Sequence, residues 1–164
     1  KSLEVLPSLM TDWASWKARY PDTTAAVSTR TAREYRRQMH QSGKPLLIGL
    51  PLGKKTFAWT YGLLNEKTIL NSYCDGRAVL AGIDKESGTA VLFDRKLDGK
   101  VLTFQWTDGR LVDDSTNSTW DLLTGIATAG DLKDQRLQQL PGILSDAAAW
   151  GRFHPESQTF DREK

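Results

Sequence analysis

Cysteine is almost absent from this sequence. Cys74 is the only one among the 164 residues, which excludes an internal disulfide and a cysteine-based zinc site. Histidine is nearly as rare, with His40 and His154 alone. The short motifs of nucleotide binding, zinc proteolysis, serine hydrolysis and covalent haem attachment are missing as well. No catalytic residue, metal ligand or cofactor is therefore assigned from motifs.

Charge excess and long apolar runs are also lacking. The formal net charge of +2 is too close to neutral to indicate a nucleic-acid partner. No apolar run approaches the roughly 20 residues that a membrane-spanning helix needs. With 39% hydrophobic and 26% charged residues, the composition is typical of a soluble globular domain.

The middle of the chain predicts antiparallel strands. Short apolar runs surround three Asp-Gly dipeptides, at 75–76, 98–99 and 108–109. Asp-Gly between apolar runs indicates a tight hairpin, because type I′ turns need positive φ at both central residues. We therefore expect a mainly β, β-rich α+β fold, in which hairpins build an antiparallel twisted sheet or a partial barrel.

The hairpin around 98–99 allows a register to be predicted. A two-residue loop pairs Leu97 with Lys100. Continued along both strands, it pairs Phe93 with Phe104 and Val91 with Trp106. One face of the hairpin is then markedly apolar, which specifies the register and buries Trp106.

The ends of the chain predict short amphipathic helices. Trp13 and Trp16 lie three residues apart between Asp12 and Tyr20, a helical spacing that Pro21 ends. A second helix is expected over 29–40. Its stripe of arginines is either a solvated face or a surface for an acidic partner; these are Arg30, Arg33 and Arg37. Residues 156–164 resemble a frayed tail.

Two distant segments repeat one another. Residues 6–23 align without gaps with residues 140–157, at an offset of 134, and share six identities, with Tyr20 at the position of His154. We expect tandem units: 1–44 as the helical tail of a preceding repeat, 45–155 as a β-rich domain, and 156–164 as a flexible tail. An aromatic packing role explains His154, and a metal or haem contact through His40 or His154 stays open.

Several stretches together resemble the bacterial domain-of-unknown-function family DUF3179. They are ILN at 69–71, GTAVLFDRKLDGKVLTF at 88–104, DDSTNSTWDLLTG at 113–125 and LQQLP at 137–141. The tail W..W...YP at 13–21 is similar to the closing motif of that family. The resemblance implies a bacterial protein of the periplasm or the extracellular space, and it implies a fold more than a reaction.

One departure from the family affects the expected chemistry. Where the family typically carries Tyr-Cys-Pro-Leu-Cys, an ungapped count from Asn71 places the two cysteines on Asp84 and Ser87. A carboxylate and a hydroxyl thus replace two soft sulfur ligands, which argues against copper or thiol redox chemistry here.

Polar residues of the family's most recognisable motifs complete a candidate polar site. Besides Asp84 and Ser87, its members are Asp94, Arg95, Asp113, Thr116 and Ser118. Asp94 and Asp113 could flank a small polar cleft. Alternatively, residues 113–120 form a turn whose side chains bond their own backbone, and Arg95 pairs with a carboxylate at a sheet edge.

Three functions follow from these features. The first is a non-catalytic extracytoplasmic module that binds or scaffolds a protein partner, as a subunit of a larger redox or surface assembly. The second is a metal-dependent or redox enzyme domain in which Asp84, Asp94 and Asp113 hold a hard cation. The third is a glycan-binding module with Trp59 and Trp120 as aromatic contacts, joined by Trp106. The missing cysteine pair favours the first.

Overall fold

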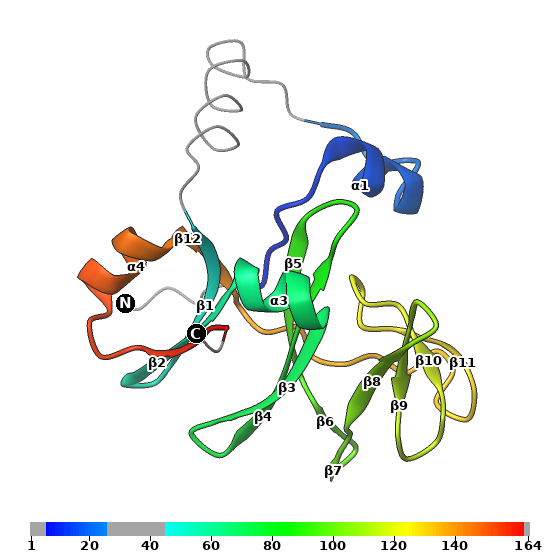
Figure 1. The fold of residues 1–164 in the computed structure, drawn as a ribbon. Helices are drawn as coiled ribbons and strands as arrows, with labels where there is room; N and C mark the ends of the chain where they lie inside the picture. Colours follow the sequence, from blue (N-terminus) through cyan, green and yellow to red (C-terminus); the bar gives the residue numbers. More distant parts are fainter. Residues whose placement is uncertain (1–5, 26–44, 163–164) are drawn as a thin grey trace.

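The computed structural model describes residues 6–25 and 45–162, and these residues form a mainly β fold (Figure 1). The described part holds several small, mostly antiparallel sheets and no closed barrel. The prediction of a mainly β fold built from antiparallel hairpins is therefore confirmed. The helix expected over 29–40, its arginine stripe and His40 lie outside the described residues.

Two short helices near the ends confirm the predicted pattern, and a third was not expected. The helices are α1 (Trp13–Arg19), α3 (Tyr61–Lys67) and α4 (Ala147–Phe153). Helix α3 buries only Leu63 and Leu64, so seven residues carry too little periodicity to be recognised in the sequence. Among the described helices, none combines the length and the apolar composition needed to cross a bilayer.

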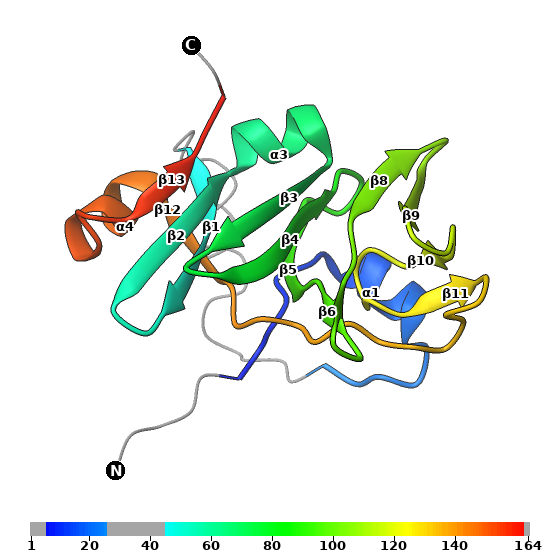
Figure 2. The ribbon, with the colours of Figure 1, turned by 90° about the horizontal axis from the view of Figure 1, so that it is seen from below.

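The first sheet has the strand order β12-β1-β2-β13. Its strands are β12 (Ile143–Asp146), β1 (Leu46–Leu52), β2 (Lys55–Thr60) and β13 (Gln158–Phe160). Strand β13 runs parallel to β2 (Figure 2), and Phe160 stacks on Trp59 with ring centroids 5.2 Å apart. The expected frayed tail is therefore wrong for residues 158–160, because the ring of Phe160 anchors them to the sheet.

The second sheet is a meander with the order β3-β4-β5. Its strands are β3 (Ile69–Cys74), β4 (Arg77–Asp84) and β5 (Thr89–Asp94). Alternate residues of β4 and β5 belong to two different cores, one shared with the first sheet and one on the opposite side. Burial on both faces explains why these strands read as continuous apolar runs and not as an alternating pattern.

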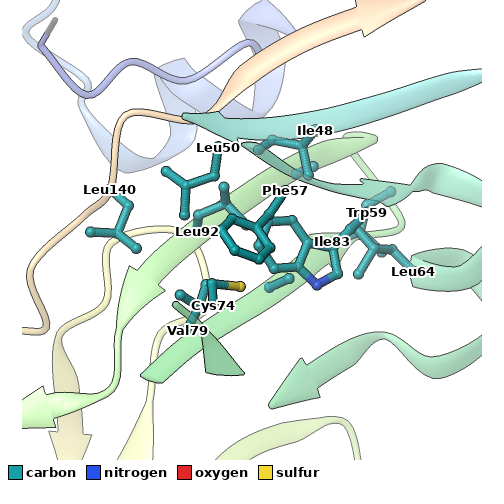
Figure 3. Close-up of a cluster of buried hydrophobic side chains, with 12 residues drawn as sticks. Ile48, Leu50, Phe57, Trp59, Leu64, Cys74, Val79, Ile83, Leu92 and Leu140 are labelled. Atoms are coloured by element: carbon teal, nitrogen blue, oxygen red, sulfur yellow. The ribbon is translucent and has the colours of Figure 1, made fainter. Parts of the chain in front are cut away.

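Figure 3 shows the core between the first two sheets, where Phe57 and Trp59 of β2 lie among Val79, Ile83 and Leu92 of the second sheet. Cys74 is buried in this cluster, and burial raises the pKa of its thiol to about 11. The only cysteine of the chain is therefore an apolar core residue that stays protonated at neutral pH.

The remaining strands form a small ribbon and a third sheet. The ribbon pairs β6 (Lys96–Leu97) with β7 (Lys100–Val101), and the third sheet has the order β11-β10-β9-β8. Its strands are β8 (Phe104–Thr107), β9 (Arg110–Asp113), β10 (Thr119–Trp120) and β11 (Ala127–Ala129). All three predicted Asp-Gly turns are confirmed, each with positive φ at both residues.

The register predicted for the hairpin around residues 98–99 is correct only near its turn. Leu97 pairs with Lys100, but Phe104 pairs with Asp113 of β9, so its predicted pairing with Phe93 is wrong. The side chain of Asn71 takes the place of a partner strand: its Nδ2 donates to Phe104 O at 2.7 Å, and its Oδ1 accepts from Phe104 N at 3.0 Å. The chain therefore leaves the second sheet and enters the third.

The predicted pairing of Val91 with Trp106 fails for the same reason. Trp106 pairs with Leu111 on β9 and is 39% exposed, so the expected burial of Trp106 is also wrong. Once the strand has changed sheets, the alternation of inward and outward side chains starts anew.

Candidate functional site

The loop between β4 and β5 brings Asp84 and Ser87 together. Asp84 ends β4 opposite Thr89, the first residue of β5. The hydroxyl of Ser87 donates to Asp84 Oδ2 and lies 2.7 Å from the hydroxyl of Thr89. Asp84 and Ser87 thus share one corner, and the two oxygen side chains bond each other there.

Asp113 is the centre of a closed hydrogen-bond network. It is fully buried and accepts bonds from backbone N–H groups of Ser115, Thr116 and Ser118 at 3.1, 2.8 and 3.2 Å. The indole Nε1 of Trp120 donates to it at 3.1 Å, and both neighbouring hydroxyls add further bonds. Residues 113–120 therefore form a turn whose side chains bond their own backbone, which was the alternative to a polar cleft in the sequence analysis.

The electrostatics of Asp113 agree with this structural role. Burial by itself raises the pKa of the carboxyl, but the hydrogen bonds from Trp120, Ser115 and Thr116 outweigh burial and lower the pKa below 3.8. A buried carboxylate saturated with donors is held in its ionised form and has little capacity left for a ligand. Removing it would leave several buried donors unpaired.

Asp94 and Arg95 take part in two other networks. Asp94 accepts from Arg77 Nε and from the backbone N–H of Lys96, both at 2.8 Å. The guanidinium of Arg95 is buried and donates to the backbone oxygens of Leu102 and Ser72, at 2.7 and 3.2 Å. It therefore joins strand β3 to the segment after β7, and the expected pairing of Arg95 with a carboxylate is wrong.

The structure does not gather the expected carboxylates into one cleft. The bonds of Asp84, Asp94 and Asp113 belong to three networks that share no residue. Over residues 6–25 and 45–162, no group of three or more His, Cys, Asp and Glu residues lies close enough to hold a metal ion.

The tryptophans named as aromatic contacts are core residues. Trp59 and Trp120 are buried. The Nε1 of Trp59 donates to the hydroxyl of Ser72 at 3.1 Å, and Trp120 meets Phe104 edge-on with ring centroids 5.7 Å apart. Neither ring is available to a surface ligand, whereas Trp106 is.

A small polar cavity lies beside the Asp84 corner. Its volume is about 210 Å³, and its lining includes Arg19 of α1, Asp84, Trp106, Arg110 and Asp121. Arg19 forms an ion pair with Asp121 at 3.1 Å. Guanidinium groups, carboxylates and a partly exposed indole in one cavity are suited to bind a small polar or zwitterionic group.

Asp121 is held in place from two sides. Besides Arg19, the backbone N–H and the hydroxyl of Thr124 donate to its carboxylate, both at 2.8 Å. Burial raises the pKa of Asp121, but the bonds from Thr124 and the nearby charge of Arg19 outweigh burial and lower it. The Asp-x-x-Thr spacing signals the local bonds, whereas the partner 102 residues away has no sequence signal.

His154 packs against an aromatic ring, as expected from its alignment with Tyr20. Its ring centroid lies 4.1 Å from that of Trp150. The aligned pair, Trp16 and Tyr20, lies 4.5 Å apart.

The comparisons with known proteins give one match. The family described as Protein of unknown function (DUF3179) matches residues 1–157. Neither the curated proteins nor the solved structures gave a match. Since the match covers nearly all of the 164 residues, the chain belongs to the DUF3179 family.

Proposed function

We propose that this chain is a non-catalytic extracytoplasmic module that binds or scaffolds a protein partner, as a subunit of a larger redox or surface assembly. One observation carries the proposal. At the positions where the resemblance to the family implies a cysteine pair, Asp84 and Ser87 form a tight corner and bond each other. A carboxylate and a hydroxyl close this corner, without thiols.

The other motif residues support a structural use of these polar groups. Asp113 binds its own turn, Arg95 crosslinks backbone segments, and Asp94 pairs with Arg77. These side chains are engaged in holding the fold around the corner. What the corner then offers is a rigid surface that a partner can recognise.

The polar cavity supplies the recognition chemistry. Arg110 and Trp106 are both exposed at its rim, and arginine and tryptophan are the residue types that most often dominate binding energy in protein interfaces. The partner would place a polar or charged side chain, or a chain terminus, between the guanidinium and carboxylate groups.

Affinity purification from the parent cells tests the proposal. The tagged wild-type chain is expected to recover a partner in stoichiometric amount, and Arg110→Glu is expected to lower the affinity for it by more than about tenfold. Lys100→Glu makes the same charge change on the exposed ribbon strand β7 and should leave recovery unchanged. If native mass measurements show only a free monomer for the wild-type chain and for both variants, the proposal is contradicted.

Location is tested separately by cell fractionation with an antibody against the chain. The proposal expects the native protein outside the cytoplasmic fraction, and a cytoplasmic protein would contradict that part of it.

Glycan binding is a second candidate that rests on Trp106 alone, because it is the exposed tryptophan at the cavity. Stacking of a sugar on this indole would change tryptophan fluorescence, and Trp106→Ala would abolish the change. A polysaccharide panel that leaves the fluorescence of the wild-type chain unaltered would dismiss this candidate.

A further inference from the structure

The repeated segments 6–23 and 140–157 fold alike in detail. Asp12 caps α1 by accepting a bond from Ser15 N at 2.9 Å, and Asp146 caps α4 by accepting from Ala149 N at 3.0 Å. Each helix ends seven residues after its cap.

The two segments also end alike. The backbone N–H of Tyr20 donates to Trp16 O at 2.9 Å, and that of His154 donates to Trp150 O at 2.8 Å. Three residues further on, the backbone N–H of Thr23 donates to Tyr20 O at 3.1 Å, as Ser157 does to His154 at 3.0 Å. The sequence repeat is therefore a repeat of local structure.

The C-terminal copy is docked on the first sheet. Strand β12 pairs with β1, and the indole of Trp150 lies over Gly49, where an added methyl group would come within 2.2 Å of Cη2. Trp150 is only 4% exposed, packs with Leu47 and Ala58, and donates from Nε1 to the hydroxyl of Ser157 at 2.9 Å.

The N-terminal copy, residues 6–23, is not paired with a described strand of this chain in the way that β12 is paired with β1. Residues 6–11 form no strand, and Trp16 lines a mostly apolar cavity of about 1160 Å³ between this segment and the first two sheets. The hydroxyl of Thr11 is buried without a hydrogen-bond partner, and Met10 is 48% exposed. Figure 1 shows α1 and α4 on opposite sides of the second sheet.

We propose that residues 6–23 are an inter-unit docking segment, which replaces the β12–α4 segment on the β1 strand of a second unit of this fold. The indole of Trp16 sits on a glycine equivalent to Gly49, and Thr23 supplies the hydroxyl at the position of Ser157. The register of β12 on β1 carries over to the complex. Leu9, Met10, Thr11 and Asp12 then lie opposite the equivalents of Gly49, Ile48, Leu47 and Leu46.

The ion pair of α1 with its own unit is compatible with this docking, whereas Leu9 would have to leave the core of its own unit, against which it packs. Arg19, which pairs with Asp121, aligns with Phe153, and Phe153 is 81% exposed on the docked copy. Arg19 can thus keep its ion pair with Asp121 while Trp16 packs on the second unit. The inference stands apart from the proposed function, because it depends on Trp16 and not on the polar cavity.

Peptide rescue of a weakened chain tests the inference. The acceptor is the 164-residue chain with Trp16→Ala and Trp150→Ala, in which neither copy can place an indole on Gly49. A peptide of residues 6–23 is expected to raise its Tm by roughly 5–10 °C at about one hundred times the dissociation constant. A peptide of residues 140–157 is the positive control.

Two peptide variants identify the anchor. Trp16→Ala should abolish the rise, whereas Trp13→Ala should retain it, because the docked copy has Ala147 at that position. If the acceptor does not melt cooperatively, the same peptides are added to the 164-residue chain with Trp16→Ala and Trp150→Phe, whose smaller ring fills the site over Gly49 only in part. A rise with 140–157 but not with 6–23, or no rise dependent on Trp16 in either acceptor, overturns the inference.

Discussion

The two copies of the repeated segment have the same local structure and opposite environments. Both cap a seven-residue helix with aspartate and end it with a ring against a tryptophan. Trp150 is buried on Gly49, whereas Trp16 lines a cavity. The comparison shows that six shared residues suffice to specify a helix and its caps, and that a strand from elsewhere in the chain decides whether the tryptophan is buried.

The largest expected difference between the copies is that between their tryptophans. Trp150→Ala should lower the free energy of unfolding by about 3–5 kcal/mol, because it empties a packed site over β1. Trp16→Ala should lower it by less than about 1 kcal/mol, because this ring is only half-buried. Urea unfolding of both variants measures the difference, and equal losses would show that the two copies are packed equally well.

Gly49 should be the next most sensitive position. Gly49→Ala pushes a methyl group into the indole of Trp150 and should cost about 1–3 kcal/mol. Gly151 lies in α4 with open space around it, so Gly151→Ala should stabilise the chain by about 0.5–1 kcal/mol through helix propensity. The Tm values of the two variants should therefore shift in opposite directions. An unchanged Tm for Gly49→Ala would refute the close contact between Gly49 and the indole of Trp150.

Loss of the helix cap should have a smaller effect. Asp146→Ala should cost about 1 kcal/mol, because the first turn of α4 loses its side-chain acceptor and α4 unfolds together with the sheet. Asp12→Ala removes the same bond from α1 and should leave global unfolding unchanged, while amide exchange in α1 becomes faster. Equal shifts in global stability would mean that α1 unfolds with the sheet as well.

The smallest effect is a local dependence on pH. Hydrogen bonds from the side chain and the backbone of Ser15 lower the pKa of Asp12 below 3.8, and Ala149 stands at the position of Ser15 in the other copy. Because the folded pKa is the lower one, the cap is fully formed above 3.8 and is lost as the pH falls through the folded value.

Ser15→Ala should therefore move the fraying of α1 to higher pH, towards the ordinary pKa of aspartate. The amide chemical shift at position 15, followed by NMR between pH 2 and 6, measures the midpoint (roughly the range around the reference pKa). An unchanged midpoint would show that the hydroxyl does not stabilise the charged cap.

Much of the strand arrangement could be predicted from local signals. Asp75, Asp98 and Asp108 each precede a glycine and take positive φ in two-residue turns, since the turn geometry depends on those two residues alone. The register beyond Leu97 and Lys100 could not be predicted. It depends on the side chain of Asn71, 33 residues from Phe104, and no periodic pattern records a contact of that kind.

The candidate site divides in the same way. Asp84 and Ser87 lie three residues apart in a turn, so their contact is local, and the resemblance to the family singled out both positions. The cavity beside them needs Arg19 to reach Asp121, 102 residues away along the chain. Trp106 became exposed because its strand changed sheets, which the hairpin pattern did not signal.

By itself, the sequence determined the features that depend on a few neighbouring residues: the Asp-Gly turns, the capped helices near both ends, the self-bonded turn around Asp113 and the membership of DUF3179. Only the tertiary structure decided which sheet each strand joins, which tryptophans are buried, and which charges meet in the polar cavity. The physical reason is range. Turns and caps are specified by hydrogen bonds between residues a few positions apart, whereas burial depends on surfaces that distant segments supply.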